Sequence, residues 1–251
     1  MSNVTVKQET HIMNPVELNA WGVPTTMSSQ DMVIPKILPM QGLSQMVADG
    51  IAKMGEFRDS ISSELLGSID QPVEIIPFYL QKHWDIMEED GKGNFKWART
   101  VPLIDNPMSP EYNDNWAWEA EDNGIKVKRV RRMNFFVLVA SQIGQGSMPY
   151  VLSFKSTSLK EGKKLFTEMY VRNVRAGVPP AAFTYTLSGK KEKNDKGTYI
   201  VPTLTRSSKT NIDALKECLE WIKVINSGAA RVDESDMKVE ASVATDETGD
   251  F

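Results

Sequence analysis

The sequence predicts a mainly β protein with helices, in which five strands form one barrel. Five segments between residues 73 and 205 combine β-branched and aromatic residues with alternating or continuously apolar patterns, which are typical of strands. An amphipathic segment at residues 158–174 separates the third strand from the fourth and has helical spacing. With 251 residues, 41% of them hydrophobic, the chain is long enough for one such core with extensions at both ends.

The first expected strand is interrupted by Pro77, which predicts a bulge or an edge position because proline cannot donate a ladder hydrogen bond. The second and third strands are joined by the glycine-containing loop 142–147, and the fourth and fifth by the loop 189–197, so each pair should form a hairpin. The expected strands span residues 73–87, 126–140, 148–156, 182–188 and 198–205.

Two helices accompany the strands. Ser158 and Glu161 match the S-x-x-E capping box and predict the start of the helix between strands three and four. A C-terminal helix is expected over residues 211–226, with Gly228 just past its end. Apolar residues recur at helical spacing in both: Leu165, Phe166, Met169, Tyr170 and Val174, then Ile212, Leu215, Leu219, Ile222 and Ile225.

This order of elements is the plan of the OB-fold, in which a helix lies between strands three and four of a five-stranded barrel. The loops between strands one and two and between strands four and five flank a nucleic-acid groove in that fold. Here they would be the acidic, aromatic insertion 88–125 and the loop 190–197. The predicted organisation is an N-terminal arm (1–32), an OB-fold-like domain (33–228) and a disordered acidic tail (229–251).

Charge is strongly segregated along the chain, although the formal net charge is only −4. Residues 1–125 contain 8 basic and 19 acidic side chains, residues 126–232 contain 20 and 7, and residues 233–251 contain 1 and 7. A cationic middle segment of this kind favours contact with a polyanion. We therefore expect the barrel to bind a nucleic acid.

Basic side chains cluster at the start of the second strand and before the fifth. Alternation places Lys126, Lys128 and Arg132 on one strand face and Arg129 and Arg131 on the other, so one groove cannot use all five. A solvated strand face and a soluble hairpin tip are the alternative interpretations. The predicted phosphate contacts are Lys126, Lys128, Arg129, Arg131, Arg132, Lys155, Lys190, Lys191, Lys193, Lys196 and Arg206.

Aromatic side chains supply a second requirement, because the bases of an unpaired strand stack on them at roughly 1–3 kcal/mol each. The alternative for each is an ordinary place in the core, to which we assign Phe135, Phe136 and Trp221. The predicted stacking residues are Trp84, Trp97, Trp116, Trp118, Tyr185 and Tyr199.

The tail, residues 233–251, is acidic, lacks apolar periodicity and ends in Phe251. A flexible polyanion of this kind could occupy a cationic groove until DNA displaces it and frees the tail for partner proteins. A C-terminal aromatic ring beside the α-carboxylate suits a pocket with a basic rim. A simple solubility device is the alternative. The predicted partner-binding residues are Asp246, Glu247, Asp250 and Phe251.

The terminal residues 246–251 (DETGDF) resemble the end of the single-stranded-DNA-binding proteins of lytic phages, and residues 191–201 resemble a stretch found in such proteins. This resemblance covers the end of the barrel and the tail only. It implies an OB-fold, a role in phage DNA replication, recombination or repair, and location in the cytoplasm of the infected host cell. It also implies contacts of the tail with the replicative DNA polymerase and helicase, and a possible homodimer.

Several other classes of function are not expected. The chain has no phosphate-binding loop and no dinucleotide fingerprint, which argues against an enzyme driven by ATP or NAD. A nuclease site is not expected among the diffuse acids Asp105, Asp114, Glu119, Glu121 and Asp122. With one cysteine, Cys218, and two histidines, we expect a buried structural thiol, no metal and no cofactor.

Nor does the sequence predict a membrane segment, since its longest apolar run, residues 135–140, is far too short to span a bilayer. Non-specific binding of single-stranded DNA without catalysis is therefore the expected function. A recombination mediator, a strand-annealing protein or a nuclease regulator is the first alternative, and a phage structural or assembly protein is the second.

Overall fold

The computed structural model describes residues 32–103, 119–122, 124–194, 197–228 and 230–233. The predicted arm (1–32) and tail (229–251) lie almost entirely outside these residues, so both stay predictions.

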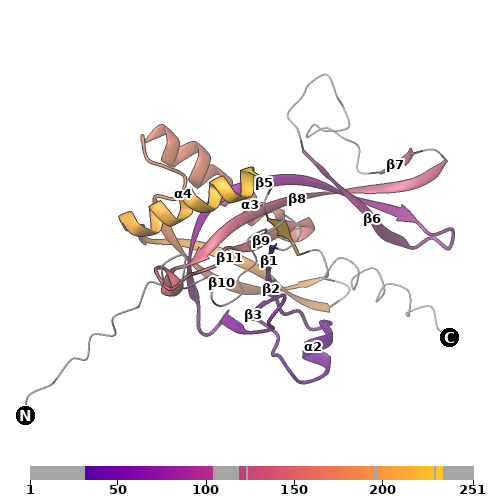
Figure 1. The fold of residues 1–251 in the computed structure, drawn as a ribbon. Coiled ribbons are helices and arrows are strands. Elements are labelled where there is room, and N and C mark those ends of the chain that lie inside the picture. Colours follow the sequence, from indigo (N-terminus) through magenta and orange to yellow (C-terminus); the bar gives the residue numbers. More distant parts are fainter. Residues whose placement is uncertain (1–31, 104–118, 123, 195–196, 229, 234–251) are drawn as a thin grey trace, which may run out of the picture.

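Five strands follow the spatial order β11–β10–β5–β8–β9, which confirms the predicted mainly β, OB-like fold (Figure 1). In chain order this is 5–4–1–2–3, with helix α3 between the third and fourth strands. All four ladders are antiparallel. The strands are β5 (Val73–Glu89), β8 (Ile125–Val139), β9 (Tyr150–Lys155), β10 (Phe183–Asn194) and β11 (Gly197–Lys209).

The first barrel strand bends where the proline predicts it. The register of β5 against β8 shifts between Pro77 and Tyr79, which confirms the bulge. Before the bulge β5 pairs with β10 as well as with β8, whereas after it β8 continues alongside β5 as far as Glu88. The bulge therefore follows the point where the pairing of β5 with β10 ends.

Beyond the barrel, β5 and β8 continue as a ribbon that carries two further strands. β6 (Phe95–Pro102) pairs with the end of β5 and β7 (Glu119–Asp122) with the start of β8, giving the order β6–β5–β8–β7. Figure 1 shows this extension, which we call the wing, projecting away from the helices. The expectation that 88–125 is a loop between two strands is thus wrong for the paired segments 95–102 and 119–122, because the short β6 pattern lies among glycines and prolines. Residues 104–118 lie outside the described residues.

The segment before the barrel connects its two outer strands. Val151 of β9 donates its backbone N–H to Pro35 O at 2.8 Å. The Gln41 amide bonds to both the N–H and the C=O of Ile200 on β11, at 2.7 and 3.1 Å. The segment 35–41 thus lies between β9 and β11.

Short elements complete the N-terminal half. A three-stranded sheet is formed by β2 (Ile37–Pro39), β3 (Glu56–Asp59) and β4 (Leu65–Ser68), with the one-turn helix α2 (Gln45–Ala48) between β2 and β3. β1 (Val33–Ile34) pairs in parallel with β12 (Arg231–Val232), so strand pairing continues past the predicted domain end at residue 228.

The helices are α3 (Leu159–Phe166), which continues as the π-helix η4 (Thr167–Asn173), and α4 (Ile212–Asn226); two 3₁₀ turns span Ala140–Gln142 and Ser156–Ser158. The predicted capping box is wrong. Ser158 Oγ bonds the backbone of Lys155 at 2.8 and 3.0 Å, which leaves the start of α3 without a side-chain cap. At α4, Asn211 Oδ1 accepts from Ala214 N at 2.8 Å and caps the helix.

The core has two main layers. Phe135, Phe154 and Tyr185 fill the inside of the barrel beneath α3, while Phe136 and Cys218 belong to the cluster between the sheet and α4. The buried face of α4 consists of Ala214, Cys218 and Ile225, so the prediction is wrong for Ile212 and Leu219, which are 65% and 58% exposed. Cys218 is buried as predicted, and burial raises the pKa of its thiol to about 12.

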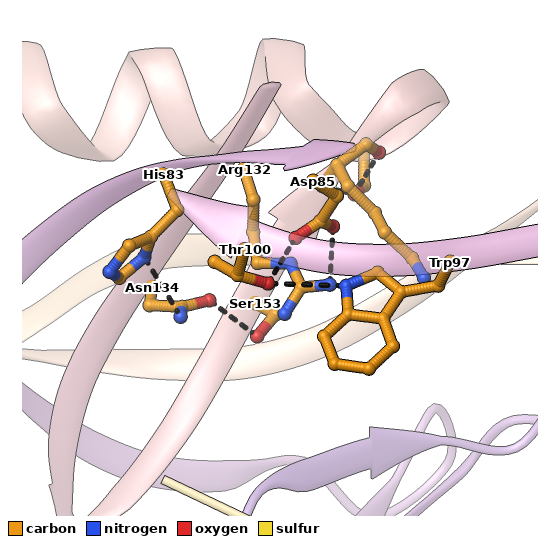
Figure 2. Close-up of polar contacts among 9 residues, drawn as sticks. His83, Asp85, Trp97, Thr100, Arg132, Asn134 and Ser153 are labelled. Atoms are coloured by element: carbon orange, nitrogen blue, oxygen red, sulfur yellow. Dashed lines mark hydrogen bonds and ion pairs between the residues drawn. The ribbon is translucent and has the colours of Figure 1, made fainter. Parts of the chain in front are cut away.

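A buried ion pair joins three strands where the ribbon leaves the barrel. Asp85 of β5 and Arg132 of β8 form this pair, and each residue is 2% exposed (Figure 2). Thr100 Oγ1 of β6 donates to Asp85 Oδ1 at 3.0 Å, and Trp97 Nε1 donates to Thr100 Oγ1 at 3.2 Å. Burial raises the pKa of the Asp85 carboxyl, and the guanidinium of Arg132 opposes that rise.

A neutral network lies beside the ion pair, on β5, β8 and β9. Ser153 Oγ donates to Asn134 Oδ1 at 2.7 Å, and Asn134 Nδ2 lies 3.4 Å from His83 Nδ1 (Figure 2). Burial, together with the nearby charge of Arg132, lowers the pKa of His83 to about 4. The imidazole is therefore neutral at physiological pH.

Removing one member of the ion pair should destabilise the protein more than removing both. Arg132→Met leaves the Asp85 carboxylate buried without its cation, and we expect a loss of about 3–5 kcal/mol in the free energy of unfolding. The double variant Asp85→Leu/Arg132→Met should recover much of that loss. Urea denaturation measures both values. A double variant that loses as much stability as Arg132→Met, or more, would contradict a coupled pair.

The lowered pKa of His83 predicts a stability that falls in acid. Below its ordinary pKa of 6.5 the unfolded chain binds a proton that the folded chain accepts only near pH 4. The wild type should therefore lose up to about 3 kcal/mol between pH 7 and pH 4 relative to His83→Gln. Urea denaturation at both pH values tests this, and parallel pH dependences of the two proteins would refute it.

Candidate nucleic-acid interface

The lysines at the start of β8 face acidic strands of the wing. Register pairs Lys126 with Glu121 and Lys128 with Glu119 across the β7–β8 ladder. Lys126 Nζ also lies 3.7 Å from a carboxylate oxygen of Glu89 on β5. Because acidic strands flank the basic strand, the charge segregation of the linear sequence is offset within the wing.

The arginines of β8 are less accessible than a groove requires. Arg129 and Arg132 are buried, so the prediction of a solvent-facing DNA contact is wrong for both. They are buried because β6 and β7 extend the sheet beyond the barrel on either side of the β5–β8 ribbon. Arg131 is half-buried and lies opposite Trp84, while Lys155 lies half-buried opposite Arg132.

Of the predicted stacking residues, likewise, some are buried and others are partly exposed. Trp84 is 5% exposed in a wing cluster and Tyr185 is 2% exposed in the barrel core, so both are wrong as exposed platforms. Trp97 is half-buried and bonded to Thr100. Tyr199 is partly exposed on β11. The other predicted contacts, Trp116, Trp118, Lys196, Asp246, Glu247, Asp250 and Phe251, lie outside the described residues.

The lysines predicted in the loop before the fifth strand belong to the strand β10. Residues 190–194 pair with residues 197–201 of β11, so the prediction of a flexible connection there is wrong. Alternation places Lys191 and Lys193 on one face of the hairpin and Lys190 on the other. All three side chains are exposed.

The helix α3 adds cations that the sequence analysis missed. Gly162 packs so close to β9 that an added Cβ would lie 2.8 Å from Phe154 Cβ. This contact turns Lys160, Lys163 and Lys164 outward, and all three are exposed. The sequence contains a signal for these cations, because the lysines are spaced so that they lie opposite the apolar residues of an amphipathic helix.

We call α3, η4 with the helical residues 174–175 that follow it, β10 and β11 together the helix–hairpin surface. α3 contacts β11 directly. Residues 150–209 contain 12 basic and 4 acidic side chains, so the cationic excess of the chain concentrates here. Within the described part of the chain, six exposed cations of this surface have no ion-pair partner: Lys160, Lys163, Arg175, Lys191, Lys193 and Lys209.

One carboxylate interrupts this surface near the hairpin tip. Glu192 lies 2.5 Å from Lys190 Nζ and accepts a hydrogen bond from the Tyr199 hydroxyl at 3.0 Å. These two contacts, with Lys160 nearby, lower the pKa of Glu192, and Glu192 in turn raises the pKa of Lys190. Lys190 and Tyr199 are therefore engaged with an anion of the protein itself.

Arg206 lies at the other end of the hairpin and is held from three sides. Its guanidinium lies over the Phe183 ring, 3.9 Å from the ring centroid. Its Nη2 lies 2.9 Å from both Glu168 Oε2 and Asn173 Oδ1 of η4. The side chain is 40% exposed.

Other kinds of site are less developed. A cavity of about 570 Å³ lies between β4 and the start of β5, lined among others by Leu65, Pro72 and Ala140. Among the described residues, no three His, Cys, Asp or Glu side chains lie close enough to hold a metal ion. No helix in the described ranges is both long enough and apolar enough to cross a membrane.

Comparison with known proteins gives one match. No curated protein and no solved structure matches the chain. The family model described as Pam3 phage gp34-like protein matches residues 17–231, which include the barrel, the wing and the helices α3 and α4. The predicted phage origin is thereby confirmed. Since the match extends over most of its length, the chain belongs to the Pam3 phage gp34-like protein family.

Proposed function

We propose that this phage protein binds single-stranded DNA without sequence specificity, in DNA replication, recombination or repair, and that the helix–hairpin surface holds the phosphate chain. The observation that carries the proposal is the set of six exposed cations on α3, after η4 and on the hairpin that have no ion-pair partner in the described part of the chain. Lys191 and Lys193 lie on the hairpin face opposite Lys190 and Glu192, which lie near α3. Cations already paired with protein carboxylates gain little from a phosphate, whereas these six are available to it.

The fold supports the same proposal. OB-like barrels bind single strands by combining a cationic groove with aromatic residues at its sides. The helix–hairpin surface includes the β10–β11 hairpin, whose tip corresponds to the loop between strands four and five that flanks the groove of an OB-fold. Tyr199 and Phe183 supply aromatic rings at its two ends.

The acidic tail completes the proposed cycle. In the absence of DNA its carboxylates would compete for the cationic surface, and bound DNA would free it to recruit replication proteins such as DNA polymerase and helicase. This part of the proposal rests on the sequence of the tail, including Phe251.

Neutralising cations of the helix–hairpin surface should weaken DNA binding more than neutralising the same number in the wing. Lys163→Gln/Lys191→Gln/Lys193→Gln should lower affinity for oligo-dT and reduce the log–log salt slope by about 2, at about 0.7 per lost phosphate contact. The matched control Lys92→Gln/Lys96→Gln/Lys126→Gln should leave the slope unchanged. Fluorescence anisotropy at several salt concentrations measures both, and a slope reduced only in the control would place DNA on the wing.

Removing the tail should tighten DNA binding. Deletion of residues 234–251 keeps Asp233, whose carboxylate accepts from Ser60 Oγ at 2.6 Å. It removes the other six of the seven acidic side chains of the tail. Affinity for oligo-dT should rise at low salt, the difference should shrink at high salt, and capture of replication proteins should be lost. Unchanged affinity at low salt would eliminate the competition between tail and DNA.

Two alternatives make different experimental predictions. A strand-annealing protein or recombination mediator would use the same surface and accelerate pairing of complementary strands, and a nuclease regulator would change nuclease activity. A structural or assembly protein would show no salt-sensitive affinity for oligonucleotides.

A further inference from the structure

Arg206 differs from the six unpaired cations of the helix–hairpin surface because its charge is already compensated by Glu168. Glu168 Oε2 accepts from its Nη2 at 2.9 Å, and the amide oxygen of Asn173 accepts from the same nitrogen. A phosphate would have to compete with the Glu168 carboxylate for this guanidinium. Attraction of a phosphate therefore does not explain why the side chain is held in this position.

The π-helix η4 is what brings both acceptors to one place. Glu168 and Asn173 are five residues apart, a spacing that an α-helix would place on different faces. A π-helix closes its turns with i→i+5 hydrogen bonds, so residues five apart lie one above the other. π-helical turns are rare and occur frequently at functional sites. Here the two acceptors in the π-helical turn hold the guanidinium plane of Arg206 in one orientation.

The opposite side of that arginine is supported by an aromatic ring. Phe183 lies beneath the guanidinium with a centroid distance of 3.9 Å and is itself packed against the barrel core. Despite these contacts the Arg206 side chain remains 40% exposed. An exposed planar group of this kind is accessible to a ligand.

We propose that Arg206, supported by Phe183, is a stacking platform for a nucleobase of the bound single strand. This inference rests on the proposed function and adds the part of the ligand that is recognised at this position. Guanidinium planes stack on unpaired bases much as aromatic rings do. The free lysines then contact phosphates and Arg206 contacts a base, which favours unpaired strands because duplex bases do not expose their faces.

Arg206→Lys separates the two roles, because lysine keeps the charge and loses the plane. Affinity would be measured for oligo-dT and for an abasic oligonucleotide of the same length. We expect Arg206→Lys to bind oligo-dT about fivefold more weakly, the equivalent of about 1 kcal/mol at the lower end of base stacking. Its affinity for the abasic strand and its salt slope should not change. Lys163→Gln, the matched control, should weaken binding of both strands by the same factor.

Thermal unfolding shows whether Arg206→Lys is folded, and Phe183→Leu, which removes the supporting ring and keeps the arginine, provides a second variant. A selective loss for oligo-dT in either folded variant supports the platform. Equal losses on both strands, no loss on either, or equal wild-type affinity for the two strands would overturn it. Wild-type protein that binds neither oligonucleotide would instead remove the proposed function itself.

Discussion

The continuous pairing of β5 with β8 is the constraint on which the rest of the structure depends. Their register runs from Ile75 opposite Val139 to Glu88 opposite Val127, so one ribbon belongs to both the barrel and the wing. At the point where β9 ends and β6 begins, the buried pair of Asp85 and Arg132 joins the strands. A buried pair of this kind contributes little net stability compared with apolar packing, but each charge requires the other, so it favours one register.

The pairing of this ribbon also determines which basic side chains remain without an acidic neighbour. In the linear sequence the acidic first half and the basic middle look like separate blocks. In the fold, β7 and the end of β5 lie on either side of the basic start of β8, so Lys126 and Lys128 face acidic residues. The cationic excess therefore moves to α3 and the β10–β11 hairpin, where only a few carboxylates such as Glu168 and Glu192 are present.

Much of the fold was predictable because it depends on local signals. Proline at position 77 marked the bulge, and the apolar pattern of residues 126–140 marked the central strand. The site was harder to predict, because burial of Arg132 and Trp84 depends on β6 and β7, two short strands whose patterns lie among glycines, prolines and acidic residues. No pattern in the sequence predicts the π-helix, since its Glu168–Asn173 spacing gains meaning only once Arg206 lies beside it.

The central claim is that single-stranded DNA lies on the helix–hairpin surface, and protection of individual lysines from acetylation tests it most directly. Full-length protein would be treated with an amine-acetylating reagent with and without oligo-dT, and each lysine quantified by mass spectrometry. The account predicts protection of Lys160, Lys163, Lys191 and Lys193, with Lys92 and Lys126 equally reactive in both samples. Protection confined to the wing lysines, or absent from all of them at saturating oligonucleotide, would contradict it.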